Sequence, residues 1–171
     1  MIFFLTGFMG SGKSYWGQKW AAANGYTFVD LDEVIEIAEG KTIADIFEIK
    51  GEDYFRKIEA TQLRNFGDAK NTIIACGGGT PCFYENMQWM NEHGTTIYLL
   101  STASQILDRV LAEQDKRPLI KKMNPGELLF FIEQKLKERT SFYNQAKLII
   151  PSIELSAQTF GNLFLAKQST A

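Results

Sequence analysis

The sequence predicts an α/β domain of three layers, in which helices cover both faces of a parallel sheet. Short apolar runs bounded by Gly, Asn, Asp or Pro alternate along the chain with longer stretches of helical spacing, which is the pattern of a doubly wound sheet. None of the runs alternates between apolar and polar residues, so each is expected to be a strand buried on both faces. The runs lie at residues 2–5, 26–29, 72–76, 95–100 and 148–150.

The longer stretches between these runs are expected to form the helical layers. A shorter helical piece is expected between Thr42 and Gly51, because Thr42 and Asp45 have the spacing of an N-terminal cap. It lies inside a long excursion between the second and third strands. The other predicted helices cover residues 14–23, 55–66, 84–92, 103–111 and 126–143.

Length and charge limit the classes of protein that fit. A chain of 171 residues and 19.4 kDa suits a single domain over residues 1–171. Its formal net charge of -2 provides no positive field to attract nucleic acid or an anionic membrane, so neither is an expected partner. The two cysteines, Cys76 and Cys82, follow no basic and apolar leader and form no disulfide framework, which indicates a cytoplasmic protein.

Residues with useful chemistry follow three of the predicted strands. In open α/β sheets, ligands bind beyond the carboxyl ends of the strands. A glycine-rich loop follows the first strand, Asp30 and Asp32 follow the second, and the glycine triplet 77–79 follows the third. We therefore expect one site at this edge of the sheet.

The loop at residues 7–14, GFMGSGKS, matches the G-x-x-x-x-G-K-[ST] motif between a predicted strand and a predicted helix. Its glycines let backbone N–H groups point into one hollow, where the start of the helix adds positive potential for a polyphosphate. Lys13 is expected to reach the β- and γ-phosphates of ATP, and the Ser14 hydroxyl to bind Mg²⁺. A glycine-rich turn without phosphate is the alternative. The ATP-binding residues expected here are Gly10, Ser11, Gly12, Lys13, Ser14 and Tyr15.

The acid that would complete a magnesium site is expected to come from the second strand. The third strand runs into Gly77 without an acidic residue, whereas Asp30 follows a strand expected beside the phosphate loop. Asp30 would hold Mg²⁺ directly or through water, or would instead cap a helix entered at Leu31. Asp32 would point the same way as Asp30 in an extended stretch, where it could contact a substrate hydroxyl and accept its proton.

Beyond the phosphate loop, the chain resembles the shikimate kinase family over most of its length. The resemblance implies the three-layer α/β/α fold of P-loop kinases, with a central parallel sheet of five strands and a substrate-binding excursion over residues 31–62. The segments that carry it are the loop at 7–14, Asp30-Leu31-Asp32, residues 43–47, Gly51-Glu52, residues 55–59, the triplet 77–79, Arg117-Pro118-Leu119, Arg139 and Tyr143.

The same resemblance implies roles for individual residues. Asp32 would bind shikimate hydroxyls and act as base, and Arg56 and Arg139 would hold the shikimate carboxylate. Glu59 would position Arg56, and an exposed helix-surface ion pair is the alternative for these two residues. The backbone of Gly77, Gly78 and Gly79 would approach the ring, because glycine allows a ligand close to the main chain.

A polar stretch at 111–125 resembles the family's lid over ATP. Arg117 within it would bring positive charge to the transferring phosphoryl group, or would be an exposed loop charge. Arg109 resembles the arginine that packs on adenine, at a spacing from Arg117 that is one residue longer than usual. Cys76 stands before the triplet, where the family often has a hydroxyl residue.

Together these expectations describe an ATP-dependent enzyme that uses Mg²⁺ and phosphorylates the 3-hydroxyl of shikimate. We expect it to act as a monomer. One alternative is a P-loop kinase for another small acceptor, such as gluconate or a nucleoside monophosphate. The other is a nucleotide-dependent switch, which would need a partner surface and a water-positioning residue that the sequence does not indicate.

Overall fold

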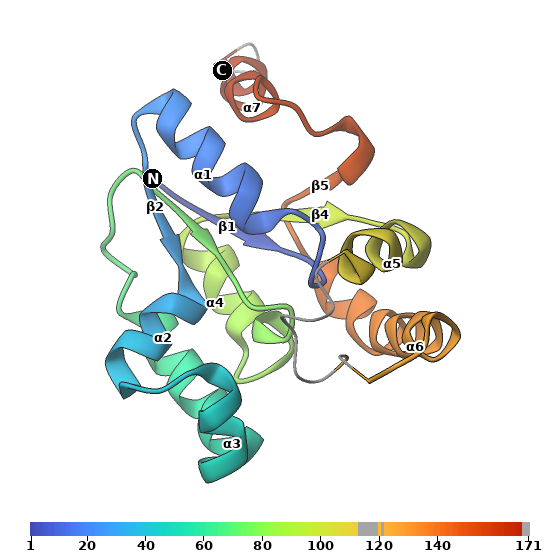
Figure 1. Cartoon of the computed structure of the whole chain (residues 1–171). Helices are drawn as coiled ribbons and strands as arrows, with labels where there is room; N and C mark the ends of the chain where they lie inside the picture. Colours follow the sequence, from blue (N-terminus) through green and yellow to red (C-terminus); the bar gives the residue numbers. More distant parts are fainter. Residues whose placement is uncertain (113–119, 121, 169–171) are drawn as a thin grey trace.

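One parallel sheet organises the chain in its computed structural model, which describes residues 1–112, 120 and 122–168 (Figure 1). The sheet has five strands in the order β2-β3-β1-β4-β5, and every neighbouring pair is parallel. The first strand is therefore central, with β3 on one side of it and β4 on the other. The strands are β1 (Ile2–Thr6), β2 (Thr27–Asp30), β3 (Thr72–Ala75), β4 (Thr95–Leu100) and β5 (Leu148–Pro151).

Helices lie on both faces of this sheet, so the predicted three-layer α/β/α architecture is confirmed (Figure 1). Phe3 and Leu5 of β1 pack in one core cluster with Trp20 and Phe160. The α-helices are α1 (Lys13–Asn24), α2 (Leu31–Glu39), α3 (Ile43–Arg64), α4 (Asn86–His93), α5 (Ala103–Leu111), α6 (Pro125–Tyr143) and α7 (Thr159–Gln168), and the 3-10 helices are η1 (Thr80–Cys82) and η3 (Ser152–Glu154).

The opposite face of the sheet carries a second cluster. Ile2 and Phe4, which alternate with Phe3 and Leu5 along β1, pack with Leu31 and other residues of α2, α3 and α4. Burial on both faces explains why β1 is apolar at consecutive positions. In a third cluster, Phe8 of the phosphate loop packs against α5 and α6, so these helices support the loop in addition to the sheet.

The expectation that all five strands are buried on both faces is wrong for the two at the edges. β1 and β3 are buried throughout, whereas β2 and β5 are mostly half-buried, with Ile149 of β5 45% exposed. A strand at the edge has a neighbour on one side only, so its apolar sequence does not fix its burial.

Helix α3 is interrupted at Gly51, whose φ of 81° and ψ of 170° are not helical. The predicted end of the first helical piece near Gly51 is therefore confirmed, and a second helical piece follows it up to Arg64. The cap at its start is confirmed, since the Thr42 side chain accepts from the Asp45 N–H at 3.1 Å. Helix α7 was not predicted.

Within the described part of the chain, no helix combines the length and apolar character needed to cross a membrane.

Candidate active site

A cavity of about 620 Å³ opens beyond the carboxyl ends of β1, β2 and β3. Ligands bind at this edge in open α/β sheets. The cavity therefore lies where the sequence predicted a site. Residues from the phosphate loop, from the end of β2 and from the glycine triplet share its wall. The lining comprises Met9, Gly10, Gly12, Lys13, Ser14, Tyr15, Trp16, Asp30, Asp32, Ala75, Cys76, Gly77, Gly78, Arg109 and Ala112.

The loop between β1 and α1 has the backbone of a phosphate cradle. Gly7, Gly10 and Gly12 have φ values of 137°, 74° and 95°, which residues other than glycine rarely adopt. The Lys13 ammonium group donates to the carbonyl oxygens of Gly7 and Phe8, both at 2.8 Å, so it lies over the loop. The loop therefore brings backbone donors, the start of α1 and a cation to one hollow.

Asp30 joins the end of β2 to the phosphate loop. Its Oδ2 accepts from the Ser14 hydroxyl at 2.7 Å, while its Oδ1 accepts from the Asp32 N–H at 3.1 Å and caps α2. The capping role of Asp30 is therefore confirmed, and its role toward Mg²⁺ stays a prediction. Ser14 and Asp30 bring two oxygen donors together, which suits a magnesium ion that would take its other ligands from phosphate and water. Within the described residues no group of three His, Cys, Asp or Glu side chains could enclose a metal without such help.

Asp32 does not lie in an extended stretch, and that expectation is wrong. It is the second residue of α2, yet it still lines the cavity beside Asp30. Burial and the neighbouring carboxylates of Asp30 and Glu59 raise the pKa of Asp32 to about 6, against the opposing charges of Lys13 and Arg56. A carboxylate with this pKa can accept a proton near neutral pH.

The glycine triplet is the point where the expected acceptor-binding side chains meet. A methyl group added at Gly77 would lie 3.1 Å from both Asp32 Oδ1 and Glu59 Oε1. One added at Gly78 would lie 3.2 Å from Arg139 Nη1 and 3.5 Å from the backbone nitrogen of residue 9 in the phosphate loop. The triplet thus forms a wall that touches the phosphate loop, the carboxylates and Arg139.

The third glycine of the triplet faces Arg56. A methyl group at Gly79 would lie 2.5 Å from Arg56 Nη2, which no side chain tolerates without movement. Gly79 has φ −93°, so its backbone would suit any residue, and only the closeness of the guanidinium requires glycine. Arg56 itself lies beyond the cavity lining, together with Gly79 and Arg139.

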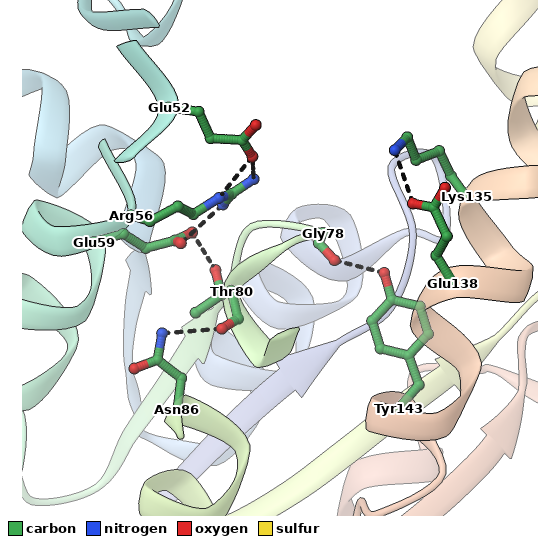
Figure 2. Close-up of polar contacts among 9 residues, drawn as sticks. All are labelled: Glu52, Arg56, Glu59, Gly78, Thr80, Asn86, Lys135, Glu138 and Tyr143. Carbon is green, nitrogen blue, oxygen red and sulfur yellow. Dashed lines mark hydrogen bonds and ion pairs between the residues drawn. The ribbon is translucent and has the colours of Figure 1, made fainter. Parts of the chain in front are cut away.

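Arg56 is held in a buried network rather than in the exposed surface pair considered as its alternative (Figure 2). Its Nη1 pairs with Glu59 Oε2 at 2.8 Å, and the Glu59 side chain is 0% exposed. Its Nε and Nη2 both lie 3.2 Å from Oε1 of Glu52, a half-exposed side chain at the rim. The ring of Phe83 has its centre 4.4 Å from the guanidinium carbon. These contacts fix the fork that the carboxylate of an acceptor would meet.

Arg139 approaches the triplet from α6. Its guanidinium carbon lies 5.4 Å from the centre of the Phe8 ring, and it has no ion pair among the described residues. The Tyr143 hydroxyl, one turn further along α6, donates to the Gly78 carbonyl at 2.6 Å (Figure 2). Helix α6 is therefore tied to the triplet, and it carries the Arg139 cation beside Gly78.

Three further expectations concern Arg109, Arg117 with the lid, and Cys76. Arg109 lines the cavity and donates to the Gly10 carbonyl at 3.0 Å, which places it at the nucleotide side. Arg117 and most of the expected lid at 111–125 lie outside the described residues. The Cys76 thiol lies 3.6 Å from the Met90 sulfur, and burial raises its pKa, so the thiol is held in its protonated form.

Two polar side chains of the site were missed in the sequence. Thr80, directly after the triplet, donates to Glu59, and Asn86 holds the carbonyl of Thr80 (Figure 2). Neither residue has a motif of its own. Only the position of Thr80 beside the triplet could have drawn attention to it.

Replacing Gly79 by alanine should test the close approach of this wall to Arg56. The added methyl group must push the guanidinium aside, so we expect the KM for the acceptor to rise about tenfold or more while the KM for ATP is unchanged. Steady-state kinetics with each substrate varied in turn would measure this. Gly161→Ala is the control, because its methyl group would meet nothing nearer than Asn24 Oδ1 at 3.8 Å. An unchanged acceptor KM in Gly79→Ala would contradict the assignment of Arg56 to the acceptor site.

Two arginines reach the glycine triplet beside a cavity lined by a phosphate loop and a basic carboxylate. This arrangement defines a P-loop kinase of small acceptors. The comparison with known proteins narrows this class. The model of the shikimate kinase family matches residues 9–165, and the chain belongs to that family.

Individual relatives agree with the family assignment. A shikimate kinase of Bacteroides thetaiotaomicron is 38% identical over 152 residues, which are 89% of this chain and 87% of the relative. A crystal structure of shikimate kinase from the same species has a TM-score of 0.89 and 34% identity, covering 99% of this chain and 97% of its own. A structure of the Acinetobacter baumannii shikimate kinase in complex with shikimate has a TM-score of 0.83 and 30% identity, covering 99% and 93%.

Proposed function

We propose that the chain is a shikimate kinase that transfers the γ-phosphoryl group of ATP to the 3-hydroxyl of shikimate, giving 3-phosphoshikimate and ADP for the pathway to chorismate and the aromatic amino acids. One observation carries the proposal. Within the glycine triplet, Gly78 lies beside both Met9 of the phosphate loop and Arg139, and Gly79 lies beside Arg56. A small hydroxy acid held by the arginines would therefore lie beside the nucleotide phosphates.

Each residue has a distinct task in this proposal. The phosphate loop from Gly10 to Tyr15 binds the nucleotide, and Arg109 contributes at the nucleotide side. Arg56 and Arg139 bind the carboxylate of shikimate, because the planar guanidinium matches a carboxylate. Asp32 orients the attacking hydroxyl and accepts its proton.

Charge on the transferring phosphoryl group is balanced from two sides. Lys13 extends from the loop to the β- and γ-phosphates when ATP binds, leaving the carbonyl oxygens that it contacts in this structure. Arg117 is proposed to act from the lid at 111–125 when the lid closes. Ser14 and Asp30 would hold Mg²⁺, which would supply charge that neutralises the phosphates. The rest of the proposal is a single domain over 1–171 that works as a cytoplasmic monomer.

The decisive experiment measures ADP production with Mg-ATP and shikimate, beside gluconate, a nucleoside monophosphate and no acceptor. Stimulation by shikimate alone is the expected result. Protein that binds ATP and responds to another acceptor, or to none, would reject shikimate as the substrate. Slow ATP hydrolysis that no acceptor changes would favour the nucleotide-dependent switch.

The metal role of Asp30 can be separated from its role as a cap. In the variant Asp30→Asn the side chain would still cap α2, because asparagine is as good an N-cap as aspartate, but it would lack the charge. We expect this variant to raise the Mg²⁺ concentration for half-maximal activity roughly tenfold. A magnesium titration at fixed ATP measures this. An unchanged titration, with an unchanged thermal midpoint, would leave Asp30 as a cap only.

A further inference from the structure

Thr80 is a fully buried hydroxyl residue behind the glycine triplet, and none of the roles above uses it. It is the first residue of η1, and its Oγ1 donates to Glu59 Oε1 at 2.5 Å (Figure 2). This is a hydrogen bond between a neutral donor and a carboxylate, the stronger kind of side-chain hydrogen bond. It joins the wall of the site to α3.

The two oxygens of Glu59 are divided between two partners. Oε1 accepts from Thr80, and Oε2 accepts from Arg56 Nη1 at 2.8 Å. Within the described residues, Thr80 provides the one hydrogen bond to Oε1. Since Glu59 is 0% exposed, bulk water has no direct access to this oxygen. Removing the Thr80 hydroxyl would leave a buried carboxylate oxygen without its donor, and the carboxylate would be free to rotate.

Thr80 is itself fixed from the other side. The Asn86 side-chain amide donates to the Thr80 carbonyl at 2.9 Å, and Arg64 Nη1 donates to Asn86 Oδ1 at 2.7 Å. Arg64, Glu59 and Arg56 all belong to α3. Helix α3 therefore holds Thr80 twice, directly through Glu59 and indirectly through Arg64 and Asn86, so Thr80 is a rigid reference point for the carboxylate of Glu59.

We propose that Thr80 is a positioning residue for the acceptor site: its hydroxyl fixes the Glu59 carboxylate, which in turn aims the Arg56 guanidinium at the carboxylate of the acceptor. The proposal rests on the proposed function for the identity of that acceptor. It assigns Thr80 no contact with shikimate or ATP. Its effect passes through Glu59 and Arg56 alone.

Thr80→Val tests this, because valine keeps the shape of threonine and removes only the hydroxyl. We expect the KM for shikimate to rise about tenfold to a hundredfold, as for loss of one partner of a buried charged group, with the KM for ATP unchanged. Thr80→Ser keeps the hydroxyl and should restore the KM for shikimate to within about threefold of the wild type. Thr61→Val is the matched control, since Thr61 lies on α3, the helix of Glu59 and Arg56, and its exposed hydroxyl donates to the Lys57 carbonyl.

The outcomes separate a positioning role from a purely structural one. Equal changes in the KM for shikimate and for ATP, or no recovery in Thr80→Ser, would overturn the proposal. Crystal structures of wild type and Thr80→Val provide a readout that needs no activity: the Arg56–Glu59 pair should be displaced in the variant and intact in Thr80→Ser. If wild type ignores shikimate, the proposed function fails by itself, whereas Arg56 unmoved in Thr80→Val contradicts the role of Thr80.

Discussion

Asp32→Asn is expected to lower kcat for shikimate phosphorylation about a hundredfold to ten-thousandfold, the range for loss of a general base. Asparagine keeps the size of the side chain and its position on α2, but it cannot accept the proton of the attacking hydroxyl. Binding of ATP depends on the phosphate loop and should be unchanged. Steady-state rates and a nucleotide-binding titration on the same preparation measure both effects. A kcat within about threefold of the wild type would reject Asp32 as a base.

The pH dependence of the wild type follows from the same residue. Asp32 must be ionised to accept a proton, and its pKa is raised from 3.8 to about 6. The rate should therefore fall as the pH is lowered through about 6, and the residual rate of Asp32→Asn should lack this step. A profile of kcat/KM from about pH 4 to 8 is the measurement. An inflection near the ordinary carboxyl pKa of about 4 would show that Asp32 is not the titrating group.

Stability should change in the opposite direction to activity. A carboxyl group with a higher pKa in the folded state binds its proton more tightly there, so its contribution to stability is complete below about pH 3.8 and is lost as the pH rises through about 6. At pH 7 the ionised Asp32 thus costs roughly 2 to 3 kcal/mol of folding free energy. Asp32→Asn should unfold at higher denaturant concentration than wild type at about pH 7, and this advantage should shrink at about pH 4.

The sequence predicted those parts of the site that are local in the chain. The loop at 7–14 is one continuous motif between a strand and a helix, so its glycines reveal the cradle in the sequence, although α5 and α6 also pack against it. The cap of Thr42 on Asp45 is local in the same sense. Asp30 and Asp32 were placed correctly at the strand end, although the helical position of Asp32 was not foreseen.

Features that depend on distant contacts were not predictable in this way. The half-exposed edge strands β2 and β5 lack the apolar–polar alternation that would have marked an exposed face, and only the order of strands decides which are covered. The burial of Arg56 and Glu59 depends on η1, which follows α3 only after strand β3. A helix-surface spacing of three residues is the same for an exposed pair and for a buried one, so spacing alone could not distinguish them.

The two arginines proposed for the shikimate carboxylate should behave alike in binding and differently in stability. Arg56→Met and Arg139→Met should each lower kcat/KM for shikimate about thirtyfold or more, since each removes a charged partner of the acceptor. Arg56→Met also leaves the buried Glu59 carboxylate without its cation, which costs about 3 to 5 kcal/mol. Arg139 has no ion pair among the described residues, so Arg139→Met should change stability by less than about 1 kcal/mol.

Chemical denaturation beside acceptor kinetics would separate these effects. In the double variant Arg56→Met with Glu59→Met, both charges of the buried pair are replaced by apolar groups, and much of the lost stability should return while shikimate binding does not. Equal destabilisation by Arg56→Met and Arg139→Met would contradict the buried network. Recovered stability without recovered binding would show that the Arg56–Glu59 pair is retained because it presents a guanidinium to the acceptor, since folding alone does not require it.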